Sequence, residues 1–243
     1  MTPLPLSETR RQAHHRLARN GNVVLVARSG ATQPGEPTRR ASAEPAAAGA
    51  VEEESRATRF MRSALSILGE TGRADFTVLE VVERSKTSLR SFYQHFSSKD
   101  ELLLALIEKI MSESTLRWRA DTDDLGAAEA LRLLIERVSA PASSTTQDSI
   151  NRGLTFYNDH LAETVPAEYA RVLAPVKVLI GDIIDRGIAE EVFAPDLDVD
   201  ASATLIMQSA MGAMRLRVLG AELNGTPLEG KHIYDFCLRA LAK

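Results

Sequence analysis

The residues best suited to chemistry lie between Thr77 and Phe96, in the segment TVLEVVERSKTSLRSFYQHF. Its second half places hydroxyl groups, an arginine and aromatic rings within a few residues of one another. An arginine can donate two hydrogen bonds to the edge of a guanine, and serine hydroxyls can bond to bases or phosphates. These side chains suit the major groove of DNA if a helix presents them on one face.

Two short helices around a tight turn are predicted to position these residues. Thr77 and Glu80 have the spacing of a capping box, in which each side chain bonds to a backbone N–H of the first helical turn. Ser88 is a second good N-cap, so a helix should begin at Val78, turn at residues 85–87, and be followed by a helix ending near residue 95. Phe92 and Phe96 lie four residues apart and are expected to face inward.

Helices this short cannot bury a core alone, so a supporting helix is needed on each side. Upstream, apolar residues at helical spacing predict a helix over 56–70, which Gly72 can end. Downstream, Ser98 and Glu101 repeat the capping-box spacing before a strongly apolar helix. The sequence therefore predicts an N-terminal three-helix, helix-turn-helix unit that binds DNA.

The outer face of the second helix and its surroundings supply the candidate DNA contacts. Arg90 suits a base edge, whereas Tyr93, His95 and Lys99 suit phosphates, Lys99 because the positive end of a helix dipole favours an anion. An ordinary surface helix could carry any one of these residues, but their combination favours DNA binding. The full set of candidates is Thr77, Lys86, Thr87, Ser88, Leu89, Arg90, Ser91, Tyr93, His95 and Lys99.

Residues 58–102 resemble the DNA-binding domain of the tetracycline-repressor (TetR) family. Ala64 and Gly72 match markers of the family's first helix, Thr77 opens the second helix, and Ser88 opens the recognition helix. The run YQHF at 93–96 and the run SKDEL at 98–102 match the family pattern without a gap. The resemblance implies an all-α fold and a homodimer on a palindromic operator, usually a repressor that a small molecule releases from DNA.

The turn departs from the family pattern. Ser85 and Lys86 stand where the family usually has Ala-Gly, so Lys86 is expected to adopt a left-handed backbone at a cost of about 1 kcal/mol. A phosphate contact made by Lys86 could offset that cost. Thr87 and Leu89 replace a valine and a polar residue, which leaves the base contacts unassigned.

Charge is divided unevenly along the chain. The whole chain carries a formal net charge of −4, which argues against general affinity for nucleic acid. Residues 56–99 hold eight Lys or Arg and four Asp or Glu, whereas residues 100–243 hold 14 and 23. A basic N-terminal unit on an acidic body fits a protein that binds specific sites.

Composition divides the chain into three parts, with boundaries at 1–51, 52–100 and 101–243. Residues 1–51 are rich in Ala, Pro and Arg, and we expect a disordered extension that is either a DNA-binding basic arm or dispensable. Its apolar run at residues 23–27 is too short for a signal peptide or membrane span, so we expect a cytoplasmic protein without a membrane partner. Residues 52–100 form the helix-turn-helix domain, and 101–243 a helical effector-binding and dimerisation domain.

The body should consist of successive helices. Residues 127–138 and 149–161 have helical spacing, and the pair Thr164 and Pro166 resembles an N-cap followed by a first-turn proline. Pro175 should kink or split the next helix, and Gly187 should cap it. Two further helices are expected, one over 199–219 and one at the C-terminus.

The resemblance implies that the last two helices form a dimer interface and that the body holds an effector pocket. The dimer candidates are apolar or small residues at helical spacing: Ile206, Ala210, Ala213, Met214, Ile233, Phe236, Cys237 and Ala240. The pocket candidates combine apolar bulk with polar tips: Trp118, Phe156, Tyr157, His160, Tyr169 and Met207. Packing within one chain is the alternative for both sets; the dimer is favoured for the first set, whereas each pocket candidate taken singly is more simply a core residue. The low aromatic content of 5% favours an acyl chain or another lipid-like effector.

Two other classes of function stay open. One is a helix-turn-helix regulator that has no small-molecule ligand and acts through a protein partner. The other is a helical-bundle enzyme, because Glu229 and His232 have the Glu-x-x-His spacing of di-iron proteins, although a second copy of that motif is absent. Cys237 is the single cysteine and excludes an intrachain disulfide. We expect no catalysis, no cofactor and no metal.

Overall fold

The computed structural model describes residues 55–221 and 225–243. Over these residues the chain is helical and has no β-strand, apart from one isolated bridge between Phe193 and Ala242. The predicted all-α fold is confirmed. The N-terminal extension predicted for residues 1–51 lies outside the described residues.

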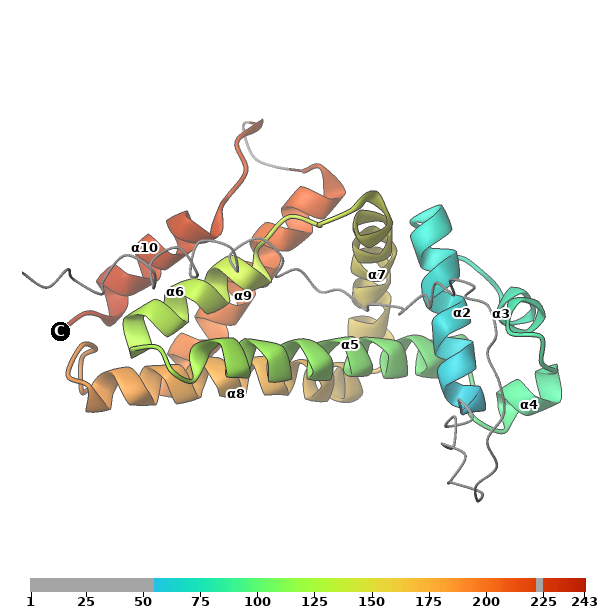
Figure 1. The fold of residues 1–243 in the computed structure, drawn as a ribbon, viewed down its shortest axis with the longest axis horizontal. Coiled ribbons are helices and arrows are strands. Elements are labelled where there is room, and N and C mark those ends of the chain that lie inside the picture. Colours follow the sequence, from blue (N-terminus) through green and yellow to red (C-terminus); the bar gives the residue numbers. More distant parts are fainter. Residues whose placement is uncertain (1–54, 222–224) are drawn as a thin grey trace, which may run out of the picture.

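Figure 1 shows an elongated arrangement with a small group of helices at one end. That group, which we call the head, contains α2 (Arg56–Thr71), α3 (Val78–Arg84) and α4 (Leu89–Tyr93). The remainder, which we call the body, contains α5 (Lys99–Thr122), α6 (Ala127–Val138), α7 (Thr145–Thr164), α8 (Pro166–Ala189), α9 (Val199–Leu219) and α10 (Gly230–Leu241). Helices α5 and α8 lie side by side along the body, and α2 packs against both α5 and α7.

The head helices begin and end where local chemistry predicts. Thr77 and Glu80 form the complete capping box of α3, and the Ser88 hydroxyl accepts a hydrogen bond from the backbone N–H of Ser91 at the start of α4. Gly72 ends α2 in a left-handed conformation with a φ of 65°. The second helix of the motif ends at residue 93, two residues earlier than expected.

The cap of α5 differs from the prediction in one bond. The Ser98 hydroxyl accepts from the backbone N–H of Glu101, as expected. The Glu101 carboxylate, however, accepts from the backbone N–H of Ser97 at 2.6 Å and from the Ser97 hydroxyl at 2.7 Å. The reciprocal bond of the box therefore goes to the residue before the N-cap.

The structure differs from the sequence-based expectations for α8 in three places. Thr164 is the last residue of α7, and Val165 precedes Pro166 at the start of α8. Pro175 lies inside α8, which continues past it, so of the two predicted effects the split into two helices does not occur. Gly187 lies inside the helix, where the buried ring of Phe193 leaves no room for a β-carbon.

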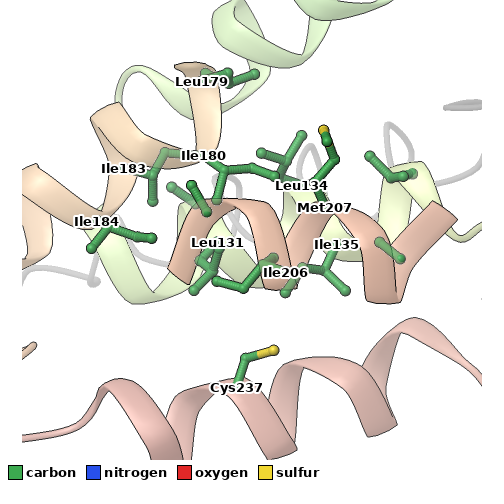
Figure 2. Close-up of a cluster of buried hydrophobic side chains, with 14 of the residues drawn as sticks. Leu131, Leu134, Ile135, Leu179, Ile180, Ile183, Ile184, Ile206, Met207 and Cys237 are labelled. Carbon is green, nitrogen blue, oxygen red and sulfur yellow. The ribbon is translucent and has the colours of Figure 1, made fainter. Parts of the chain in front are cut away.

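Two hydrophobic cores hold these helices together. The body core joins α6, α8, α9 and α10, and Figure 2 shows its side chains converging from these helices. The second core fills the head and continues into the body through Ile150 and Leu154 of α7 and Val172 of α8. The head therefore shares this second core with parts of α5, α7 and α8, and α7 packs directly on α2.

Within residues 55–221 and 225–243, no helix is long and apolar enough to cross a membrane.

Candidate nucleic-acid interface

Helix α4 presents an exposed face that carries most of the predicted DNA contacts. Leu89 is 43% exposed and Tyr93 58% exposed, and the side chains of Ser88, Arg90 and His95 are also exposed. Among the described residues, the Arg90 guanidinium has no hydrogen bond or ion pair. Its donors are therefore available to a ligand outside the chain.

Aromatic packing fixes the orientation of this face. Phe92 is fully buried, and its ring meets Phe60 edge-on with 5.3 Å between the ring centroids. The ring of Tyr93 stands edge-on against Phe92 at 5.4 Å, and Phe96 packs against Phe92 at 5.8 Å. A helix of five residues has little stability of its own. These rings hold it in place and direct Arg90 outward.

Hydrogen bonds from α2 support the turn before α4. The Arg59 guanidinium donates to the backbone carbonyl of Ser85 at 2.7 Å. The hydroxyls of Ser85 and Thr87 lie 2.6 Å apart, so the Thr87 hydroxyl has a partner within the turn. Lys86 is exposed and has a φ of 51°, as its replacement of a glycine predicts.

Replacing Lys86 with glycine is expected to stabilise the protein by about 1 kcal/mol, because glycine adopts a positive φ without steric cost. If Lys86 also contacts a phosphate, the variant should have a shallower dependence of DNA affinity on salt. Thermal melting and DNA titrations at several salt concentrations measure both effects. A more stable variant with an unchanged salt slope would exclude the phosphate contact.

Three of the ten candidate residues are placed differently from the prediction. Ser91 is buried, and its hydroxyl accepts a hydrogen bond of 3.5 Å from Arg56. The Thr77 hydroxyl is engaged by its own capping box. The Lys99 ammonium donates to the backbone carbonyls of Ala74 at 2.9 Å and Phe76 at 3.2 Å.

Lys99 therefore joins head and body. Its ammonium lies over the rings of Phe76 and Tyr157, 5.5 Å and 5.1 Å from their centroids. Tyr157 of α7 donates a hydrogen bond to Asp100, and His160 lies 3.3 Å from the same carboxylate. Burial, assisted by Asp100, raises the pKa of Tyr157 above its ordinary value, so the phenol stays protonated as the donor.

The capping carboxylates make the head sensitive to acid. Hydrogen bonds from Ser97 lower the pKa of Glu101, and those from Thr77 lower the pKa of Glu80, below the ordinary value of 4.5. Because the unfolded state then binds protons more readily, this stabilisation is present above that value and is lost as pH falls through the lowered pKa. The melting temperature of an E80Q/E101Q variant should be lower than that of the native chain near about pH 7 and should converge with it near about pH 3. A gap that persists at low pH would contradict this account.

The predicted effector-pocket residues do not line one pocket. Trp118 and Met207 are buried in the body core, and His160 is exposed at the Asp100 contact. Phe156, which is 60% exposed, and Tyr157 line an open cavity of about 600 Å³ between the head and α7.

Tyr169 alone of the six lies at a cavity inside the body. This cavity of about 70 Å³ is enclosed by α5, α7, α8 and α9. Its lining comprises Ile107, Ile110, Met111, Gln147, Ile150, Asn151, Leu154, Thr155, Asn158, Tyr169, Leu173, Met211 and Met214.

Most predicted dimer residues are used within the chain. Five of the eight are buried in the chain's own core: Ile206, Ala210, Ala213, Ile233 and Cys237. Met214 lines the body cavity, whereas Phe236 and Ala240 are exposed. The stripes in α9 and α10 therefore mark mainly the intrachain core. The large exposed apolar side chains of these helices are Leu205, at 69%, and Phe236, at 72%.

Several residues with structural importance were not singled out from the sequence. Arg59 secures the turn from a distant position in the chain, which no local pattern reveals. Gln94 is exposed at the C-cap of α4, directly after Tyr93. The polar residues of α7 in the cavity wall recur every three or four positions among apolar ones, and this spacing could have identified them.

The residues that suggested an enzyme have a structural role. The ring nitrogen Nδ1 of His232 accepts a hydrogen bond of 3.2 Å from the backbone N–H of Glu229, within the cap of α10. In the part of the chain that the structure describes, no group of three or more His, Cys, Asp or Glu is placed to hold a metal ion. Cys237 is buried, and burial raises the pKa of its thiol.

Comparison with solved structures gives several helical regulators of the same fold. The fatty acid degradation regulator FadR from Bacillus halodurans has a TM-score of 0.62 and 15% identity, over 77% of this chain and 96% of that one. FadR from Bacillus subtilis in complex with stearoyl-CoA has a TM-score of 0.58 and 17% identity, over 76% of this chain and 97% of that one. The reduced form of NemR from E. coli has a TM-score of 0.59 and 11% identity, over 77% of this chain and 96% of that one.

Sequence comparison points to the same group of proteins through the head. No curated protein matched the chain. Residues 60–106, which include α3, α4 and the start of α5, match the family model described as bacterial regulatory proteins, tetR family. Residues 60–106 therefore form a DNA-binding domain of the TetR family, and the whole chain has the all-α fold of the solved structures.

Proposed function

We propose that the chain is a repressor that binds a palindromic operator as a homodimer and is released by a small, largely apolar effector. The observation that carries the DNA-binding role is the exposed face of α4, where the Arg90 guanidinium has no partner among the described residues. A rigidly held, unpaired arginine beside an exposed tyrosine is suited to reading a base edge and contacting a phosphate.

The second copy would cover the exposed apolar residues of α9 and α10. Leu205 and Phe236 are largely exposed in the single chain and lie on two helices that contact each other, and exposed large apolar side chains favour an interface. A twofold dimer would present two α4 helices to two half-sites of one operator.

The body cavity is our candidate for the effector site. Its apolar lining fits a lipid-like molecule, and the Bacillus subtilis protein of the same fold was solved with stearoyl-CoA. Helix α7 forms one wall of the cavity and also packs on α2 of the head. A molecule that displaces α7 would therefore change the orientation of α4 and release DNA, provided that it binds the displaced state more tightly.

The contact between α7 and α2 depends on Gly153. A β-carbon there would lie 2.6 Å from a side-chain methyl of Leu68 and 3.4 Å from the backbone nitrogen of Arg73. Leu68 is fully buried and cannot move away freely. We expect Gly153→Ala to destabilise the protein by about 1–3 kcal/mol and to weaken operator binding. Calorimetric melting and DNA titration measure the two effects.

Gly181→Ala is the matched control. Its β-carbon would meet only Val199, at an ordinary distance of 3.8 Å, and alanine favours a helix interior over glycine by about 1 kcal/mol. The control should be as stable as the native chain or more so. Equal stability and equal operator affinity of the two variants would show that the Gly153 contact does not affect DNA binding by the head.

Selection of bound fragments from sheared genomic DNA tests the proposed function. The selection is made at about 0.15 M salt, which weakens non-specific phosphate contacts, and an R90A/Y93A variant serves as the control. A palindromic motif enriched by the native chain and lost by the variant is the expected result. A folded protein that enriches no motif would contradict the proposal.

A further inference from the structure

The walls of the body cavity differ in chemistry. Helices α5, α8 and α9 contribute aliphatic and methionine side chains together with Tyr169. Helix α7 contributes four polar side chains, Gln147, Asn151, Thr155 and Asn158, which follow one another at intervals of three or four residues. A molecule in this cavity would meet apolar surface on most sides and hydrogen-bonding groups along one edge.

None of the described residues that line the cavity is charged. The neighbouring Arg215 is already neutralised, because both of its terminal nitrogens donate to the Asp159 carboxylate at 2.7 Å. A carboxylate or ammonium group buried here would have no counterion, and burying an unpaired charge is strongly unfavourable. The part of any ligand that enters the cavity must therefore be uncharged.

One buried hydrogen-bond acceptor in the wall lacks a donor among the described residues. Gln147 donates to the side-chain oxygen of Asn151 at 2.8 Å, so these two side chains partly satisfy each other. The side-chain oxygen Oδ1 of Asn158 is buried and has no hydrogen-bond partner among residues 55–221 and 225–243. An amide oxygen can only accept, so it requires an N–H or O–H donor.

We propose that the effector is a neutral, mainly aliphatic or alicyclic molecule with a hydroxyl or N–H group that donates to Asn158. The proposal rests on the function proposed above and specifies its ligand class. The cavity is about 70 Å³, so binding requires expansion. Met111, Met211 and Met214 line it, and unbranched methionine side chains can rearrange readily. That expansion would displace α7, the helix that packs on the head.

Three probes with equal numbers of non-hydrogen atoms test the chemistry directly: nonanol, methyl octyl ether and octanoate. Nonanol offers an O–H donor, the ether offers none, and octanoate carries a charge. Affinities are measured by calorimetric titration of the full chain. We expect nonanol to bind about tenfold or more tightly than either of the others, because the donor satisfies a buried acceptor.

Asn158→Leu should remove the preference for nonanol over the ether. It should not unfold the chain, because it replaces a buried, unpartnered polar atom with an apolar group of similar size. Phe156→Leu, a change at an exposed position on the same helix, is the control and should keep the preference.

The outcomes separate this inference from the proposed function. Equal affinity for nonanol and ether, tight binding of octanoate, a preference that survives in Asn158→Leu, or no binding by any probe would overturn the inference. DNA titration with each probe is a separate readout. Selective binding of nonanol without a loss of operator affinity would support the ligand chemistry and contradict the effector role. Release of DNA by probes that bind with equal affinity would support the effector role of the cavity and contradict the proposed ligand chemistry.

Discussion

Replacing both Arg90 and Tyr93 with alanine is expected to lower operator affinity by about 2–6 kcal/mol, at about 1–3 kcal/mol for each of two half-sites. The arginine is assigned the larger share, because a bidentate bond to a guanine both binds and discriminates. Tyr93 is 58% exposed and Arg90 is exposed, so neither substitution removes a buried side chain. The melting temperature should fall only slightly, through the loss of the edge-on contact between Tyr93 and Phe92, which is worth about 0.5–1.5 kcal/mol.

Fluorescence anisotropy with an operator fragment from the selection measures this loss. Arg171→Ala is a charge-matched control, because Arg171 lies on α8 in the body and makes an exposed ion pair with Glu108. It should bind the operator as the native chain does. Similar losses in the control and the double variant would assign DNA binding to overall charge and contradict the role of α4.

Placing glutamate at both Leu205 and Phe236 is expected to convert the protein to a monomer and to reduce operator affinity by about a hundredfold or more, because binding at two half-sites is lost. In a single chain these side chains are 69% and 72% exposed, so the change should leave each subunit folded. In a dimer, the same carboxylates would be desolvated opposite a second copy without counterions.

Sedimentation velocity gives the oligomeric state, and anisotropy gives the affinity. Leu116→Glu is the matched control: Leu116 is 67% exposed but lies on α5, away from the proposed interface. It should stay dimeric. A native chain that sediments as a monomer, or a double glutamate variant that remains a dimer, would contradict the assignment of α9 and α10.

Features that depend on residues a few positions apart could be predicted from the sequence alone. Thr77 and Glu80 define the start of α3 because a capping box is complete within one helical turn. Lys86 adopts a positive φ because the turn requires it whatever surrounds it. The bounds of α6 and α9 also match the prediction, and α9 is capped locally by Asp198 at its start and Gly220 at its end.

The tertiary structure alone determined what each apolar or polar face contacts. Helical spacing places Ile206 and Ala210 on an apolar face of α9 and Ile233 on an apolar face of α10. It does not show whether these faces are covered by their own chain or by a second copy. Lys99 is directed to two backbone carbonyls of the head because folding brings residues 74 and 76 beside α5. Likewise, the body cavity combines residues of four helices. Its polar edge and the unpartnered oxygen of Asn158 arise only from their packing, because the requirement of a buried atom depends on which groups surround it.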